Sequence, residues 1–201
     1  MTLTLLLSLC LFTLAMSITP GPNNVMLTAS GLRFGFRRTI PHMLGICVGV
    51  MLMVLGVGLG MSSLFSAFPL LYPVLKYVGA AYLLYLAWRI MRAGSPGRAG
   101  EHAKPFTFLQ AAAFQWVNPK AWIMVIGAIA TYLPQQGFLG NLLLLMLIFG
   151  AVNLPSIAVW AYAGSLLREV LHTKRAVQIF NTGMALLLVA SLYPALAGAA
   201  G

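Results

Sequence analysis

Two short polar segments interrupt otherwise apolar stretches, and both contain residues that could bind a small charged molecule. The first is Thr19-Pro20-Gly21-Pro22-Asn23-Asn24. Its prolines cannot donate backbone hydrogen bonds, so they leave carbonyl groups free one turn back, and the glycine between them favours unwinding. Asn23 and Asn24 add amide groups where the next helix would begin, and a helix N-terminus attracts anionic groups such as carboxylates. The segment therefore predicts a broken helix with a binding function; the alternative is a simple proline kink capped by asparagine.

A second polar segment, Gln115-Trp116-Val117-Asn118-Pro119-Lys120, lies in the middle of the stretch 107–132. Lys120 is about midway along that stretch, so the sequence predicts it near the centre of a membrane. An ionisable side chain at that depth costs at least about 2.5–3.5 kcal/mol to insert and is by default a functional residue. The alternative is that the helix is shifted and that Lys120 lies at the membrane surface.

No acidic residue inside the apolar stretches is available to pair with Lys120. The chain has only two acids, Glu101 and Glu169, and both lie in basic segments. We therefore expect the partner of Lys120 to be an anionic group of the substrate. The site suits a neutral zwitterion, with its carboxylate toward Lys120 or the helix N-termini and its ammonium toward freed carbonyls and asparagine oxygens. Metal cations prefer carboxylate oxygens, so neither a metal site nor a cofactor is expected.

Two other polar residues are weaker candidates. His42 follows Pro41 and is predicted to open the second helix near the cytoplasmic face, in an interfacial or gating role. Asn153 precedes Pro155 and predicts a kink in the fifth helix that faces the cavity. Lys120 is the leading candidate for proton coupling, and His42 is the second. The candidate substrate-binding residues are Pro20, Gly21, Pro22, Asn23, Asn24, Gln115, Asn118, Pro119, Lys120 and Asn153.

The composition predicts an all-α integral membrane protein. Of the 201 residues, 61% are hydrophobic and only 7% are charged, whereas soluble domains have roughly 25% charged residues. This composition excludes a soluble enzyme and a disordered chain, and two cysteines cannot form a disulfide scaffold. There is no carboxylate pair, histidine cluster or phosphate-binding loop, so no enzymatic activity is expected. A membrane-spanning helix needs about 20 apolar residues, and the chain has enough for about six.

The basic residues predict the orientation of these six helices. We place the helices at 3–32 (broken near 20–22), 40–60, 72–91, 107–132, 138–165 and 176–197. Ten of the twelve basic residues lie in the first, third and fifth loops: Arg33, Arg37, Arg38, Arg89, Arg92, Arg98, Lys104, Arg168, Lys174 and Arg175. Loops rich in Lys and Arg remain in the cytoplasm, so both chain termini are expected outside. The basic residues do not form a groove with interleaved aromatic residues, so no nucleic-acid partner is expected.

The sequence predicts a single transporter domain, 1–201, whose two halves arose by duplication. Residues 79–87 align loosely with residues 183–191, and Pro22 and Pro119 each interrupt the opening helix of a half. We expect two inverted three-helix repeats, 1–98 and 105–201, with broken first and fourth helices. Such repeats are characteristic of secondary transporters. The alternative is that helices rich in glycine, alanine and leucine align by chance.

The motifs at Thr19–Asn24 and Trp116–Lys120 occur in the same order as in the LysE/RhtB amino-acid exporter family, which the sequence resembles over nearly its whole length. The Pro-Gly-Pro-Asn-Asn segment and the Gln-aromatic-Val-Asn before the lysine are similar to the cysteine/O-acetylserine exporter branch. The resemblance implies export of amino acids from the bacterial cytoplasm across the inner membrane, driven by the proton gradient. The motif positions of the family correspond to Pro20, Gly21 and Pro22, and to Asn118, Pro119 and Lys120.

Three other functions remain open from the residues alone. Cys10 and Cys47 could carry electrons in a membrane redox protein, although small apolar fillers are the simpler interpretation. A structural subunit would need no lysine inside the membrane, and a small-solute or cation exporter would be expected to contain membrane carboxylates. Gly45 and Gly49 form a small-xxx-small pair that usually marks close helix packing and could support a homodimer. The expected partners are thus a small amino acid, protons and membrane lipid.

Overall fold

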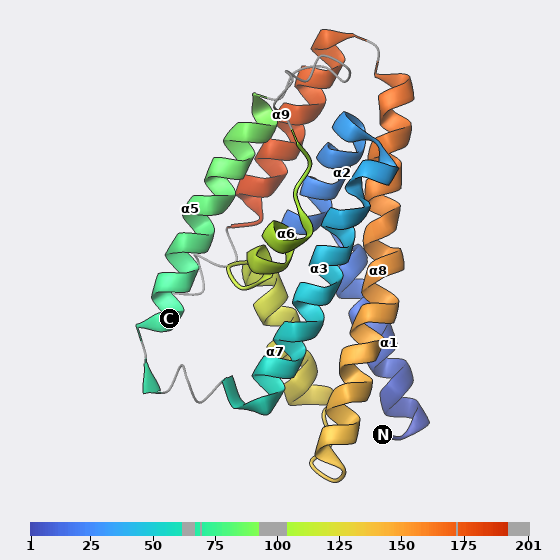
Figure 1. Cartoon of the computed structure of the whole chain (residues 1–201), viewed down its shortest axis with the longest axis vertical. Helices are drawn as coiled ribbons and strands as arrows, with labels where there is room; N and C mark the ends of the chain where they lie inside the picture. The colour runs from blue at the N-terminus through green and yellow to red at the C-terminus, as the bar shows by residue number, and fades with distance from the viewer. Residues whose placement is uncertain (62–66, 69, 93–103, 172, 193–201) are drawn as a thin grey trace.

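The computed structural model describes residues 1–61, 67–68, 70–92, 104–171 and 173–192. Every regular element among these residues is helical, and the chain forms an elongated helical bundle (Figure 1). The helices are α1 (Leu3–Ile18), α2 (Pro22–Phe34), α3 (Phe36–Gly56), the π-helical turn η1 (Val57–Met61), α5 (Leu71–Met91), α6 (Phe108–Gln115), α7 (Pro119–Tyr132), α8 (Phe138–Val170) and α9 (Lys174–Ala190).

The first predicted helix is broken where the prolines indicated. α1 ends at Ile18 and α2 begins at Pro22, with a bend of 55° between them. Proline suits the first position of a helix because its missing N–H would have no partner there and its φ angle is already helical. The segment between the two helices therefore exposes backbone carbonyls that no helix uses.

The fourth predicted helix is also broken at the expected place. Thr107 and Gln110 form a capping box that starts α6, and α6 ends at Gln115. Asn118 then caps α7 by accepting a hydrogen bond from the backbone N–H of Lys120 (3.2 Å), and Pro119 occupies the first helical position. Both predicted breaks are therefore confirmed.

Several predicted boundaries were wrong, because helices extend into the basic segments. Only Gly35, with a φ of 82°, separates α2 from α3, so no long basic loop exists there. His42 consequently lies within α3 rather than opening it, and Pro41 is inside the same helix. α8 continues past Pro155 to Val170, so Arg168 lies in its last turn. Arg98 and residues 193–197 of the sixth predicted helix lie outside the described residues.

Glycines allow the helices to approach closely. α2 packs on α8, where a Cβ on Gly31 would clash with the Ala161 carbonyl and one on Gly164 with the Thr28 carbonyl. Gly45 and Gly49 pack against α6, at Phe108 and Ala112 respectively. The close packing predicted from this pair is confirmed, but it occurs within the chain. This glycine face is therefore not a surface for a second copy.

The bundle has two ends of different chemistry. Figure 1 shows the α2–α3 junction, the end of α5 and the α8–α9 junction at one end, and the start of α1 and the α7–α8 turn at the other. The first end carries Arg33, Arg37, Arg89, Arg168 and Lys174. At the second end, the N-terminal ammonium of Met1 donates to Asn141 Oδ1 (3.0 Å).

The outward faces of the helices are apolar. Leu7, Leu109 and Leu139 are each more than half exposed, at 54%, 75% and 62%. Among the described helices, α3, α5 and α8 are long and apolar enough to cross a membrane, and the bent pair α1 and α2 would make a fourth crossing. The predicted all-α membrane class is therefore confirmed.

Candidate functional site

The two helix breaks lie against each other inside the bundle. Asn23 Nδ2 donates to Gln115 Oε1 (2.8 Å), and Gln115 Nε2 donates to Asn23 Oδ1 (3.2 Å). This reciprocal amide pair joins the start of α2 to the end of α6 across 92 residues of sequence. The two segments that the sequence singled out thus form one site.

Lys120 makes the second connection between the breaks. Its ammonium donates to the Thr19 carbonyl (2.7 Å), the Thr19 hydroxyl (2.9 Å) and the Pro20 carbonyl (3.2 Å). These are the carbonyls released by the break between α1 and α2. In this structure Lys120 binds the carbonyls that the sequence assigned to a substrate ammonium.

Gly21 makes room for this contact. A Cβ at this position would lie 2.7 Å from Lys120 Cδ and 3.1 Å from Nζ. The φ angle of Gly21 is −177°, which is ordinary extended backbone. The glycine is therefore needed for the close approach of the lysine side chain and not for an unusual backbone conformation.

The neighbouring amides hold the broken backbone in place. Asn24 Nδ2 donates to the carbonyls of Ser17 (2.9 Å) and Thr19 (2.8 Å), and so binds the frayed end of α1. Asn118, besides capping α7, donates to Gln115 Oε1 (3.3 Å). Lipid offers no hydrogen bonds, so a broken helix in a membrane requires such internal partners.

A cavity lies between the breaks and against α8. It encloses about 350 Å³ of empty space, part of it open to solvent. Its lining includes seven of the predicted residues: Gly21, Pro22, Asn23, Asn24, Asn118, Lys120 and Asn153. Pro20 and Gln115 are not in the lining but hydrogen-bond to residues that are, and Pro119 begins the helix that carries Lys120.

Asn153 and Ser17 bring buried polar atoms to this cavity. Asn153 is 4% exposed and Ser17 is 5% exposed. Among the described residues, neither Asn153 Oδ1 nor Ser17 Oγ has a hydrogen-bond partner. A buried polar atom without a partner costs about 1–3 kcal/mol, so a polar molecule in the cavity would be stabilised here. Ser17 is not among the residues predicted from sequence, although its position one turn before Pro20 could have indicated it.

The apolar residues that line the rest of this cavity were not predicted from the sequence. Met16, Val50, Ala121, Met124 and Ile157 complete the lining. They come from α1, α3, α7 and α8, and nothing in their spacing marks them as different from core residues. The described lining, with one cation, several amides and apolar walls, matches the chemistry of a small molecule that has an anionic group and a short apolar part.

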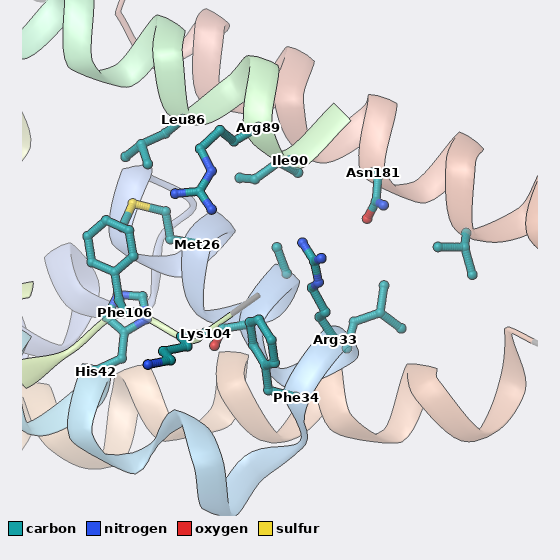
Figure 2. Close-up of a pocket in the computed structure, with 14 residues that line it drawn as sticks. Met26, Arg33, Phe34, His42, Leu86, Arg89, Ile90, Lys104, Phe106 and Asn181 are labelled. Carbon is teal, nitrogen blue, oxygen red and sulfur yellow. The ribbon is translucent and has the colours of Figure 1, made fainter. Parts of the chain in front are cut away.

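His42 does not belong to this site. It is 1% exposed and lines a second cavity at the basic end, where its ring stacks on Phe106 with 5.1 Å between centroids (Figure 2). The two proton-coupling candidates therefore line different cavities.

The cysteines do not pair. Both are free thiols; Cys10 is half-buried and Cys47 is buried. Cys47 Sγ donates to the Gly150 carbonyl (3.6 Å), and neither cysteine lines the cavity between the breaks. In the part of the chain that the structure describes, no group of three or more His, Cys, Asp or Glu residues could hold a metal ion.

The chain is also similar in sequence to known proteins. A family model described as LysE type translocator matches residues 14–191. Proteins named cysteine/O-acetylserine efflux protein, from Escherichia coli strain K12 and Shigella sonnei strain Ss046, are each 34% identical to this chain over 194 residues. The alignments cover 94% of this chain and 96% of each relative. The protein of the same name from Salmonella choleraesuis strain SC-B67 is 35% identical with the same coverage. No solved structure gives a significant match.

Proposed function

Because the chain belongs to the LysE type translocator family, and is thus a translocator and not an enzyme, we propose that it exports small neutral amino acids or their derivatives. Export would be from the bacterial cytoplasm across the inner membrane. The name of the relatives, cysteine/O-acetylserine efflux protein, supports this substrate class. None of the described residues that line the cavity is acidic, which also favours a zwitterion over a cationic substrate.

The observation that carries the proposal is the meeting of two broken helices around one cavity that contains Lys120. The substrate carboxylate replaces the Thr19 and Pro20 carbonyls as the acceptor for the Lys120 ammonium. A charged acceptor makes a stronger hydrogen bond than a neutral carbonyl, so this exchange is favourable. The substrate ammonium then binds the released carbonyls and Asn153 Oδ1, which has no partner among the described residues.

Transport requires the site to open to each side of the membrane in turn. We propose six spans in two inverted halves: α1–α2, α3 and α5, followed by α6–α7, α8 and α9. Each half begins with a broken helix whose second part starts at a proline, Pro22 or Pro119. The clustering of basic residues at one end supports a cytoplasmic location for that end, with both termini outside. The proton gradient drives export, with Lys120 as the leading proton carrier and His42 as the second.

The experiment that tests this proposal is efflux of radiolabelled O-acetylserine and cysteine from proteoliposomes, with and without a proton gradient. We expect Lys120→Met to lower the efflux rate at least tenfold, because the carboxylate loses the one cationic partner among the described residues of the cavity lining. Lys174→Met is the matched control, since Lys174 is exposed at the start of α9 and the variant should transport normally. Size-exclusion chromatography checks that both variants are folded.

A second variant separates binding from folding. Asn153→Leu keeps the branched shape of the side chain but removes the buried acceptor, so it should raise the substrate concentration for half-maximal transport. Undiminished efflux by folded Lys120→Met protein would remove Lys120 from the mechanism, and efflux independent of the proton gradient would refute proton coupling.

A further inference from the structure

A second, larger cavity lies at the basic end of the bundle. It comprises about 740 Å³ of empty space, part of which is open to solvent. α2, α3, α5 and α9 surround it, together with residues 104–106 before α6 (Figure 2). The function proposed above does not explain this cavity, and the first cavity shares none of its lining residues.

Three cationic side chains line the second cavity. Arg33, Arg89 and Lys104 come from α2, from α5 and from the segment before α6. Figure 2 shows the guanidinium groups of Arg33 and Arg89 extending into the space from opposite sides. None of the described lining residues is acidic, and the whole chain has only two acids. Even if both acids reached this cavity, it would retain a positive charge and attract an anion.

Buried polar atoms in the same cavity lack partners. His42 is 1% exposed, and in the described part of the chain neither of its ring nitrogens is hydrogen-bonded. The buried Arg33 Nε also has no hydrogen-bond partner among the described residues. Buried polar groups in proteins are normally hydrogen-bonded. A carboxylate would satisfy Arg33 Nε and the ring nitrogen of His42 that carries the proton, because it accepts hydrogen bonds from a guanidinium and from an imidazole N–H.

α2 connects the two cavities. Its first turn, Pro22–Asn24, lines the cavity between the breaks, and its later residues, from Met26 to Phe34, line the basic cavity. At about 1.5 Å per residue, Asn23 and Arg33 are roughly 15 Å apart along the helix axis. The apolar side chains of Met26, Leu86 and Phe106 lie beside the cations, so the cavity suits a small molecule with one anionic group and a short uncharged part.

We propose that this basic cavity is a second substrate site, which binds the carboxylate of the amino acid on the cytoplasmic side before the amino acid reaches the broken helices. This inference rests on the proposed export function. Arg33 and Arg89 hold the carboxylate, and the buried His42 ring contributes an N–H donor. The continuity along α2 favours a small solute over a membrane lipid, whose phosphate headgroup has similar chemistry.

The transport test uses inverted membrane vesicles, which present the cytoplasmic face to added O-acetylserine. We expect Arg33→Gln to raise the KM for uptake about tenfold, equivalent to about 1.4 kcal/mol, with a much smaller change in the maximal rate. Arg38→Gln is the matched control, because it removes the same charge from an exposed residue of α3 outside the cavity. Arg33→Lys should restore part of the affinity, because it keeps the charge.

Binding to purified protein provides an independent measurement. Lys120→Met protein in phosphatidylcholine nanodiscs should still bind O-acetylserine in an Arg33-dependent manner, and should not bind its carboxamide, which lacks the anionic group. Size-exclusion chromatography confirms folding, and the same titration on protein with native Lys120 provides the reference.

The outcomes distinguish the two proposals. An unchanged KM in folded Arg33→Gln protein, or equal binding of acid and carboxamide, would overturn the second site and leave the first intact. Normal transport by Lys120→Met together with a raised KM in Arg33→Gln would support the second site and overturn the role of Lys120. If phosphatidylglycerol in the nanodiscs abolished Arg33-dependent binding, the cavity would be a lipid headgroup site and the assignment to the substrate would be wrong.

Discussion

Replacing Gly21 by alanine should disturb the contact between the two broken helices while leaving the backbone unstrained. The extended backbone of Gly21 accepts any residue, so the substitution acts through the added Cβ alone. That atom would lie 2.7 Å from Lys120 Cδ, whereas carbon atoms in contact normally lie about 3.5–4.0 Å apart. The lysine side chain must therefore move by about 1 Å.

A movement of this size is enough to break at least one of the three hydrogen bonds of the Lys120 ammonium. The bond to the Pro20 carbonyl is already 3.2 Å long and would be lost first. A hydrogen bond from a charged group contributes about 1.5–3 kcal/mol. Because Lys120 is half-buried and water screens its charge, the lower figure of about 1.5 kcal/mol applies. The population with a released ammonium should therefore rise roughly tenfold.

Amine-specific labelling followed by peptide mass spectrometry measures this change. In Gly21→Ala protein, Lys120 should be labelled about ten times faster than in the native protein, while exposed Lys174 serves as an internal reference. Gly140→Ala is the matched control, because no atom lies within 4 Å of the Cβ that it adds. Native labelling of Lys120 in folded Gly21→Ala protein would refute the conclusion that this glycine exists to admit the lysine.

Two further predictions concern stability and use thermal or denaturant unfolding in detergent. A double-mutant cycle of Asn23→Ala and Gln115→Ala should give a coupling of about 1–2 kcal/mol for the reciprocal amide pair; additive effects would show that the two breaks are not energetically linked. Gly164→Ala should destabilise the protein by about 1–3 kcal/mol, because its Cβ would clash with the backbone of α2, whereas Gly183→Ala, which adds a Cβ in open space, should not. Equal stability of these two alanine variants would contradict the proposed close packing of α2 on α8.

The sequence was sufficient for the class of protein and for the places where its helices break. Composition alone requires a membrane, because a chain with 7% charged residues cannot cover a soluble surface. Proline lacks an N–H and has a fixed φ, and together with the neighbouring Gly21 and Asn118 this made Pro22 and Pro119 indicators of the two breaks. Proline alone was not sufficient, because Pro41 and Pro155 lie inside continuous helices. Helix ends at basic segments were harder to predict, because arginine and lysine are good helix formers and their charge does not stop a helix.

The tertiary structure decided which groups meet. Spacing along a helix tells which residues share a face but not which helix that face contacts. Asn23 therefore could not be paired with Gln115 from sequence, nor Lys120 with the Thr19 carbonyl, across 92 and 101 residues. Packing of Gly45 against α6 and placement of His42 in the basic cavity likewise depend on how separate helices fit together. Local chemistry determined the breaks; the long-range packing of complementary shapes determined that both breaks form one site.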